Sequence, residues 1–231
     1  MQQSIQEQPV LGFWRGVRDM LPLSVAVIPW GILAGSAAVN AGLSTLQAAG
    51  MSVLVFAGAA QLVSLSMVMA GASIFSIVMT IFFLTSQHFV YGLSLRSAAA
   101  EWPLMKRLCL GFLLTDELYA TAMLKSERPF AYLLGAGFSF YLCWVGCSMA
   151  GIGLAHAVPD LSALHLEFSI VAVFLVMAIM LIQNWAAAAG VMASSAAILL
   201  FSWLQLEAGI LLAGLCGMLV SALIDQGQSS K

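Results

Sequence analysis

Two adjacent acids, Asp116 and Glu117, lie inside the apolar stretch FLLTDELYATAML at residues 112–124. The nearest basic residues along the chain are Arg107 and Lys125. A carboxylate at the centre of a membrane helix costs roughly 3 kcal/mol on insertion scales, so it is expected to face a cavity or a partner. The pair therefore indicates a substrate or proton site, a cap or ion pair with another segment, or acids at an interface.

The geometry of a helix limits how the two acids could act together. Successive side chains point about 100° apart, so Asp116 and Glu117 can share one ligand only if the helix is broken beside them. In that case Thr115 or Asp116 could cap a half-helix beginning at this point, by accepting backbone N–H bonds.

Further polar residues lie within apolar runs. Gln61 follows FAGAA, where a buried amide needs partners; an interhelical hydrogen bond would supply one as well as a ligand would. His88, in TSQHFVYG, could exchange a proton near neutral pH, although a lone histidine is more often a packing residue. Gly31 and Gly58 allow close backbone approach, which is common in any packed helix bundle.

The composition identifies the class of protein that must position these residues. The 231-residue chain is 62% hydrophobic and 8% charged, with a mean hydropathy of +1.01, whereas soluble domains are about a quarter charged. No Asp, Glu, Lys or Arg occurs from 20 to 95 or from 168 to 206. One membrane crossing needs about 20 apolar residues, so several spans are expected.

The apolar runs predict an all-α, polytopic membrane helix bundle of seven to eight segments, because spans are helices or closed barrels and apolar/polar alternation is absent. We expect an N-terminal tail over 1–14, one integral membrane transporter domain over 15–225 and a polar C-terminal tail over 226–231. Arg15 and Arg18 before the first apolar run resemble a secretory signal, but the downstream sequence is equally hydrophobic, which favours an uncleaved helix. The predicted segments are 20–39, 47–70, 74–95, 108–124, 130–155, 168–186, 190–206 and 208–224.

Charge placement suggests that some segments do not cross fully. The positive-inside rule requires three basic groups on one side, but complete crossings would separate them. Breaks at Pro29-Trp30-Gly31 and Ala57-Gly58, and the short acidic segment at 108–124, are candidates for broken or re-entrant helices; alternatively, the rule fails here. The segments 27–35 and 141–151 share only a Trp and small-residue spacing, too little to indicate a repeat. The three basic groups are Arg15 with Arg18, Arg96 with Lys106 and Arg107, and Lys125 with Arg128.

Several functional classes are disfavoured. The 8 basic and 10 acidic residues form no stripe for nucleic acid, and the HExxH, GxSxG and phosphate-loop motifs of enzymes are absent. No cofactor or metal site is expected: Cys143 and Cys147 could share a helical face but have no accompanying ligands. The polar loop at 156–167, with His156, Asp160, His165 and Glu167, is interpreted as a solvated connection. Secondary transport, rather than an enzyme, is the simplest expectation.

The chain resembles the AzlC family over about residues 12–225. The resemblance is carried by RDMLPLSVAVIPWGILAGSAAVNAGLS, SVLVFAGAAQLVSLSMVMAGAS, the His88 region and TDELYA at 115–120. Its most specific elements are P-x-G, with Pro29 and Gly31, and FAGAAQ, which ends at Gln61. Family members often show Asn-x-Arg-His where this chain reads Thr85-Ser86-Gln87-His88, which leaves the residue that holds a substrate carboxylate in doubt.

The resemblance implies a bacterial inner-membrane, multi-pass exporter of branched-chain amino acids, working with a small AzlD-type membrane subunit and surrounded by membrane lipid. A half-helix N-terminus near Gly31 or Gly58 could bind the substrate carboxylate, and an acid could meet the amino group or a proton. A non-transporting scaffold subunit, a channel or an exporter of another solute are the alternatives. The residues implicated in binding or coupling are Pro29, Gly31, Gly58, Gln61, His88, Asp116 and Glu117.

Overall fold

The computed structural model describes residues 9–155, 175, 179, 182, 184–204, 206 and 209–229, and all regular structure within them is helical, as predicted. The helices are α1 (Pro9–Ala26), α2 (Ile28–Asn40), α3 (Thr45–Leu54), α4 (Gly58–Met69), α5 (Ile74–Thr85), α6 (Gln87–Ala99), α7 (Leu104–Leu113), α8 (Asp116–Met123), α9 (Phe130–Ala155), α11 (Trp185–Trp203) and α12 (Gly209–Ser229). The polar loop at 156–167 and its His and acidic residues lie outside the described residues.

The first four apolar segments are each interrupted near the middle. The predicted break at Ala57-Gly58 is present, because α3 ends at Leu54 and α4 begins at Gly58. The break expected at 29–31 lies slightly earlier, at Val27, where α1 and α2 meet at a bend of 59°. Pro29 occupies the first turn of α2, where its missing N–H removes no helical hydrogen bond. Further breaks separate α5 from α6 and α7 from α8.

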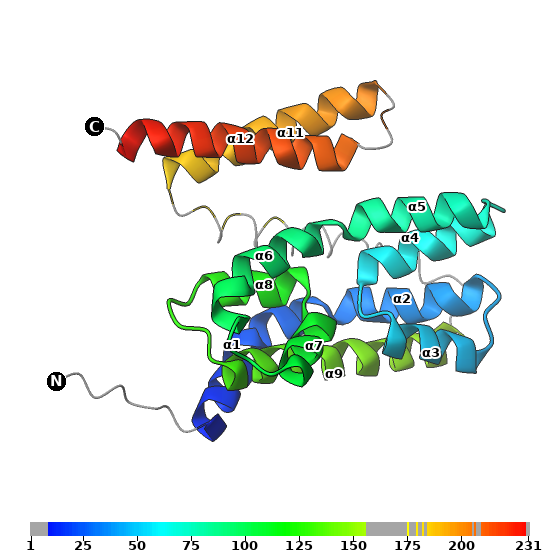
Figure 1. Ribbon diagram of the computed structural model, residues 1–231. Helices are drawn as coiled ribbons and strands as arrows, with labels where there is room; N and C mark the ends of the chain where they lie inside the picture. The colour runs from blue at the N-terminus through cyan, green and yellow to red at the C-terminus, as the bar shows by residue number, and fades with distance from the viewer. Residues whose placement is uncertain are drawn as a thin grey trace.

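Two of the broken segments turn back on themselves. In Figure 1 the α2–α3 and α4–α5 turns lie at one end of the bundle, so α3 and α4 form a hairpin that enters and leaves at that end. The α6–α7 and α8–α9 connections lie at the opposite end, so α7 and α8 form a second hairpin from the other side. This arrangement agrees with the expectation of re-entrant segments.

The expected count of seven to eight segments is not confirmed. Among the described residues, three helical stretches are long and apolar enough to cross a membrane, at 74–99, 130–155 and 185–203. The bent pair α1–α2 adds a fourth if it forms one span. The count falls because the second and fourth predicted segments are hairpins, and because the segment 168–186 lies mostly outside the described residues.

The hairpins also account for the distribution of basic residues. Figure 1 places the beginning of α1, the α6–α7 connection and the α8–α9 connection at the same end of the bundle. These segments carry the three basic groups named above. A full crossing by α7–α8 would have separated the last two groups, whereas a hairpin keeps them together. The fold is therefore consistent with the positive-inside rule.

The helix boundaries reveal an internal repeat that was not predicted from the sequence. Adding 59 to the bounds of α2 gives those of α6, and the same offset converts α3 into α7. The starts of α4 and α8 differ by 58 residues, from Gly58 to Asp116. The region from α1 to α4 and the region from α5 to α8 thus have one backbone plan, and their hairpins enter from opposite ends (Figure 1). Inverted repeats of this kind underlie many secondary transporters.

Helix α9 holds the two repeats together, because it packs against α1, α2, α3, α7 and α8. Small residues let these backbones approach closely. A Cβ atom on Gly135 would lie 2.1 Å from the carbonyl oxygen of Phe13 in α1, and one on Gly151 would lie 2.0 Å from that of Ile32 in α2. Substitution at either glycine would therefore separate α9 from the first broken segment. The remaining helices, α11 and α12, pack mainly on each other and reach the rest through α5 (Figure 1).

Candidate functional site

All four helix breaks meet at one pocket with an empty volume of about 500 Å³. Irregular backbone at membrane depth is tolerated where protein or a water-filled cavity surrounds it, so the breaks and the pocket explain each other. The lining consists of Val27, Trp30, Phe56, Ala57, Gly58, Ala59, Ala60, Leu84, Thr85, Gln87, His88, Thr115, Asp116, Glu117, Phe140 and Trp144.

One wall of the pocket is the N-terminus of α4. The N-cap residue Ala57 provides no side-chain hydrogen bond, and the helix begins Gly58-Ala59-Ala60, all of which line the pocket. The N–H groups of a first helical turn have no partner within their own helix, and the helix dipole makes this end positive. No acidic residue lies in this first turn. The wall is therefore suited to bind an anion.

The N-terminus of α8 also faces the pocket, but its first turn carries two acidic side chains, whereas that of α4 carries none. Thr115 caps it, because its Oγ1 accepts a hydrogen bond from the N–H of Leu118 at 3.3 Å. Asp116 and Glu117 form the first turn, and both line the pocket although they are adjacent in sequence. The helix break just before Asp116 lets both side chains reach the pocket, as expected for adjacent residues that share one site. Glu117 is only 4% exposed.

Two residues of α6 hold Asp116 in place. Gln87 donates from Nε2 to Oδ1 at 3.0 Å and to Oδ2 at 3.3 Å, and the Tyr91 hydroxyl donates to Oδ1. Tyr91 in turn stacks on Tyr119 of α8, with ring centroids 4.2 Å apart. Both partners of Asp116 are neutral. Within the described part of the chain, no Lys or Arg pairs with Asp116 or Glu117, so their charge can meet a cationic group.

An aromatic wall lies between the two helix N-termini. Trp30 of α2 and Trp144 of α9 meet edge to face, with ring centroids 6.0 Å apart, and a Cβ atom on Gly58 would lie 2.8 Å from Cη2 of Trp144. Phe56, in the break between α3 and α4, packs on Phe140 of α9 at 5.9 Å. The Nε1 donor of Trp144 is buried and has no hydrogen-bond partner among the described residues. The wall thus combines apolar surface with one available donor.

His88 lies at the edge of the pocket, one residue after Gln87. Its Nδ1 lies 2.9 Å from the carbonyl oxygen of Thr85, which can only accept, so this nitrogen carries a proton. Nε2 is then the atom that could accept or release a second proton. The ring contacts Tyr91, with centroids 5.5 Å apart, and Tyr91 bonds Asp116. His88 therefore packs, through a ring contact, against the tyrosine that bonds Asp116.

Three residues implicated by the sequence lie outside the pocket lining. Gln61 is fully buried and donates from Nε2 to Oγ of Ser52 at 3.1 Å, which ties α4 to α3 across their break. Gly31 packs against α9, where an added Cβ would lie 2.7 Å from Cβ of Cys147. Its N–H bonds the carbonyl of Val27, just as the N–H of Gln61 bonds that of Ala57 at the start of α4. Pro29 shapes this same turn.

The side chains that complete the pocket were not predicted from the sequence. Trp30 and Phe56 adjoin motifs that were recognised, and Gln87 directly precedes His88. Trp144 and Phe140 lie on α9, far along the chain, and no spacing rule connects them to the acids. A signal did exist for Trp144, because a large indole within a run of small residues needs a partner for its N–H. Among the described residues, no group of three His, Cys, Asp or Glu could hold a metal ion.

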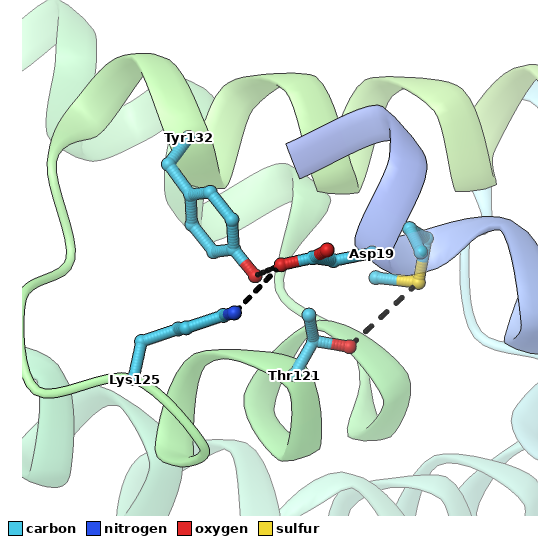
Figure 2. Close-up of polar contacts among 5 residues, drawn as sticks. Asp19, Thr121, Lys125 and Tyr132 are labelled. Atoms are coloured by element: carbon cyan, nitrogen blue, oxygen red, sulfur yellow. Dashed lines mark hydrogen bonds and ion pairs between the residues drawn. The ribbon is translucent and has the colours of Figure 1, made fainter. Parts of the chain in front are cut away.

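The far end of α8 is fastened to α1 and α9 by a polar cluster, shown in Figure 2. Asp19 of α1 accepts from Lys125 at 2.8 Å and from the Tyr132 hydroxyl at 3.0 Å, both at Oδ2. Nearby, the Thr121 hydroxyl contacts the sulfur of Met20 at 3.9 Å. One end of α8 therefore faces the pocket, and the other is anchored near the surface of the bundle.

Comparisons with known proteins show the family to which the chain belongs. The profile described as AzlC protein matches residues 22–158. The chain is similar to "Inner membrane protein YgaZ" of Escherichia coli K12, with 31% identity over 73% of this chain and 74% of the relative. It is also similar to an "Uncharacterized membrane protein" of Archaeoglobus fulgidus, with 31% identity over 90% of this chain and 94% of that protein. No solved structure matches the chain.

Proposed function

Because the chain belongs to the AzlC family of membrane proteins, we propose that it is a secondary transporter that exports branched-chain amino acids across the bacterial inner membrane. The observation that carries the proposal is the pair of opposed half-helices, which bring an uncapped helix N-terminus and two acids into one pocket. Discontinuous helices of this kind form the substrate sites of many secondary transporters. We assign substrate binding and ion coupling to this pocket, and no enzymatic reaction is proposed for it.

A zwitterionic amino acid matches the charge pattern of the pocket. Its carboxylate binds the free N–H groups of Gly58-Ala59-Ala60, helped by the buried Nε1 donor of Trp144. Its ammonium group binds Asp116 or Glu117. Gln87, which stands where relatives often have arginine, favours this arrangement, because a neutral partner leaves the Asp116 charge available.

The rest of the lining supports the proposal of a substrate with an apolar side chain. An apolar surface for the side chain of leucine, isoleucine or valine is offered by Trp30, Phe56, Phe140 and Trp144. A charged substrate side chain would lose its hydration there without gaining a partner. His88, which reaches Asp116 through Tyr91, is assigned to proton coupling.

The proposed topology places the end of the bundle that holds the basic groups at the cytoplasmic face, in accordance with the positive-inside rule. The protein is multi-pass, and α3–α4 and α7–α8 enter from opposite faces without crossing. A small AzlD-type membrane subunit is proposed as its partner. The broad apolar faces of α5, α11 and α12 provide surface for lipid or for such a subunit.

The test is efflux from cells preloaded with labelled leucine, isoleucine, valine or methionine, with the chain expressed alone and with an AzlD-type subunit. Asp116→Asn and Glu117→Gln are each expected to slow saturable efflux at least tenfold, because hydrogen bonds to charged groups contribute about 1.5–3 kcal/mol. Glu101→Gln, at an exposed acid outside the pocket, is the matched control. Unchanged efflux in both acid variants at normal expression would exclude the assigned role.

Competing analogues separate the two ends of the substrate. Leucine amide lacks the carboxylate, and 4-methylpentanoate lacks the ammonium group. Both are expected to compete poorly with leucine, and Asp116→Asn should weaken leucine amide more than 4-methylpentanoate. If the purified chain binds none of these compounds with or without a small subunit, it is a scaffold or carries another solute.

A further inference from the structure

A second, separate cavity lies between α6 and α7. It is an open groove with an empty volume of about 900 Å³, and most of its surface is apolar. Gly92 and Leu95 of α6 and Leu110 and Gly111 of α7 line it. Leu95 and Leu110 belong to the buried core, so the floor of the groove is part of the folded body. The groove shares no lining residue with the amino acid pocket.

Two arginines stand on the apolar walls of this groove. Arg96 lies in the last turn of α6, and Arg107 lies in the first turns of α7, on either side of the α6–α7 connection. Within the described part of the chain, neither guanidinium has an ion-pair or hydrogen-bond partner. Lys106, by contrast, lies over the ring of Phe130 at 5.1 Å and does not line the groove. The groove is therefore lined by two positive charges and, among the described residues, by no acidic side chain.

We propose that this groove binds an anionic phospholipid. The headgroup phosphate lies between Arg96 and Arg107, and one acyl chain follows the apolar floor between the helices. Guanidinium groups favour phosphate because their planar donors match its oxygens. Basic pockets between membrane helices on the cytoplasmic side are suited to acidic headgroups, and the basic end of this bundle is the one that carries the groove.

Two open glycines give the acyl chain its space. A Cβ atom on Gly92 or Gly111 would meet no atom within 4 Å, so their side of each helix is empty rather than packed. Glycine costs a helix interior about 1 kcal/mol relative to alanine, and no neighbouring atom in the described chain requires it here. An occupant from the bilayer fills this space without displacing any side chain.

The position of the groove connects it to the amino acid pocket. Gly92 directly follows Tyr91, which bonds Asp116, and the groove residue Leu114 directly precedes Thr115, the cap of α8. An acyl chain in the groove therefore packs against the helix segments that carry Tyr91 and Thr115, on the side away from the amino acid pocket. The lipid site nevertheless stands on its own contacts and does not depend on the identity of the substrate.

The test uses the full-length protein, purified in detergent and stripped of lipid, with phosphatidylglycerol and phosphatidylethanolamine of identical acyl chains. Native mass spectrometry measures how much of each lipid remains bound. We expect phosphatidylglycerol to bind more tightly, and the double variant Arg96→Gln/Arg107→Gln to bind it about 30-fold more weakly, from about 1 kcal/mol per arginine. Lys106→Gln is the matched control and should retain the preference.

A second variant tests the groove rather than its charge. Gly111→Leu fills the empty side of α7 without a backbone clash and should reduce phosphatidylglycerol binding, whereas Gly146→Leu, at an equally open glycine of α9, should not. Glycerol 3-phosphate, which has the phosphate but no acyl chains, should not compete. Equal binding of the two lipids, or a preference that survives both the arginine and the Gly111 variants, would overturn the proposal.

Discussion

The contact between Gly58 and the two tryptophans gives the sharpest test of the pocket. In Gly58→Ala, the new Cβ would lie 2.8 Å from Cη2 of Trp144 and 3.0 Å from Cζ2 of Trp30. Carbon atoms rarely approach within 3.0 Å, and both rings are nearly inaccessible, at 2% and 5% exposure, so they cannot swing into solvent. Overpacking of this kind costs about 1–3 kcal/mol.

That cost should appear as a lower melting temperature. A change of 1 kcal/mol shifts the melting temperature of a protein of this length by about 2–4 °C, so Gly58→Ala should melt roughly 2–12 °C below the parent. Gly50→Ala is the matched control, because Gly50 lies in α3 of the same hairpin and its added Cβ would meet no atom within 4 Å. The control should be neutral or slightly stabilising, since alanine favours a helix.

The assay is thermal unfolding of the detergent-purified protein, followed by fluorescence-detected size exclusion. Trp144→Phe removes the Cη2 atom, so Gly58→Ala should cost less in that background than in the parent, which a double-mutant cycle measures. Equal melting temperatures for the Gly58 and Gly50 variants, or an undiminished cost after Trp144→Phe, would refute the packing described for this wall.

Two further predictions concern residues that brace the hairpins. Ser52→Ala removes the acceptor of the buried Gln61 amide and should cost about 1–3 kcal/mol, measured as a lower melting temperature against Ser66→Ala, whose hydroxyl is exposed. Asp19→Asn weakens the ion pair with Lys125. Because the Asp19 and Lys125 side chains are 32% and 44% exposed, the free energy of unfolding should fall by no more than about 1 kcal/mol. A larger loss would show that this ion pair is not a partly solvated contact.

The helix breaks were predictable from the sequence, whereas most of the side chains around them were not. Gly58 lies within the short run of small residues at 57–60, and Thr115 precedes two acids, so local chemistry predicted both half-helix starts. The interhelical hydrogen bond considered for Gln61 is present, to Ser52. These features depend on neighbours within a few positions, which is the range over which sequence is informative.

The inverted repeat could not be found by comparing residues. At equivalent positions of the two hairpins, the first repeat has Gly58 and the second has Asp116, because the two half-helices present opposite charges to one pocket. The helix boundaries are shared, while the residues at equivalent positions differ along the helices, for example TLQAAGMSVL in α3 and LMKRLCLGFL in α7. The aromatic wall was missed for a related reason, since Trp144 reaches the pocket through the packing of α9 rather than through a motif.

The uncapped start of α4 also determines what a vacant pocket must contain. The N–H groups of Gly58-Ala59-Ala60 have no acceptor in their own helix, and leaving each unsatisfied in an apolar environment costs about 1–3 kcal/mol. Hydration must therefore replace any departing ligand. Binding and release at this site are exchanges of solute for water, so the dehydration of three backbone amides contributes to selectivity as directly as the shape of the aromatic wall.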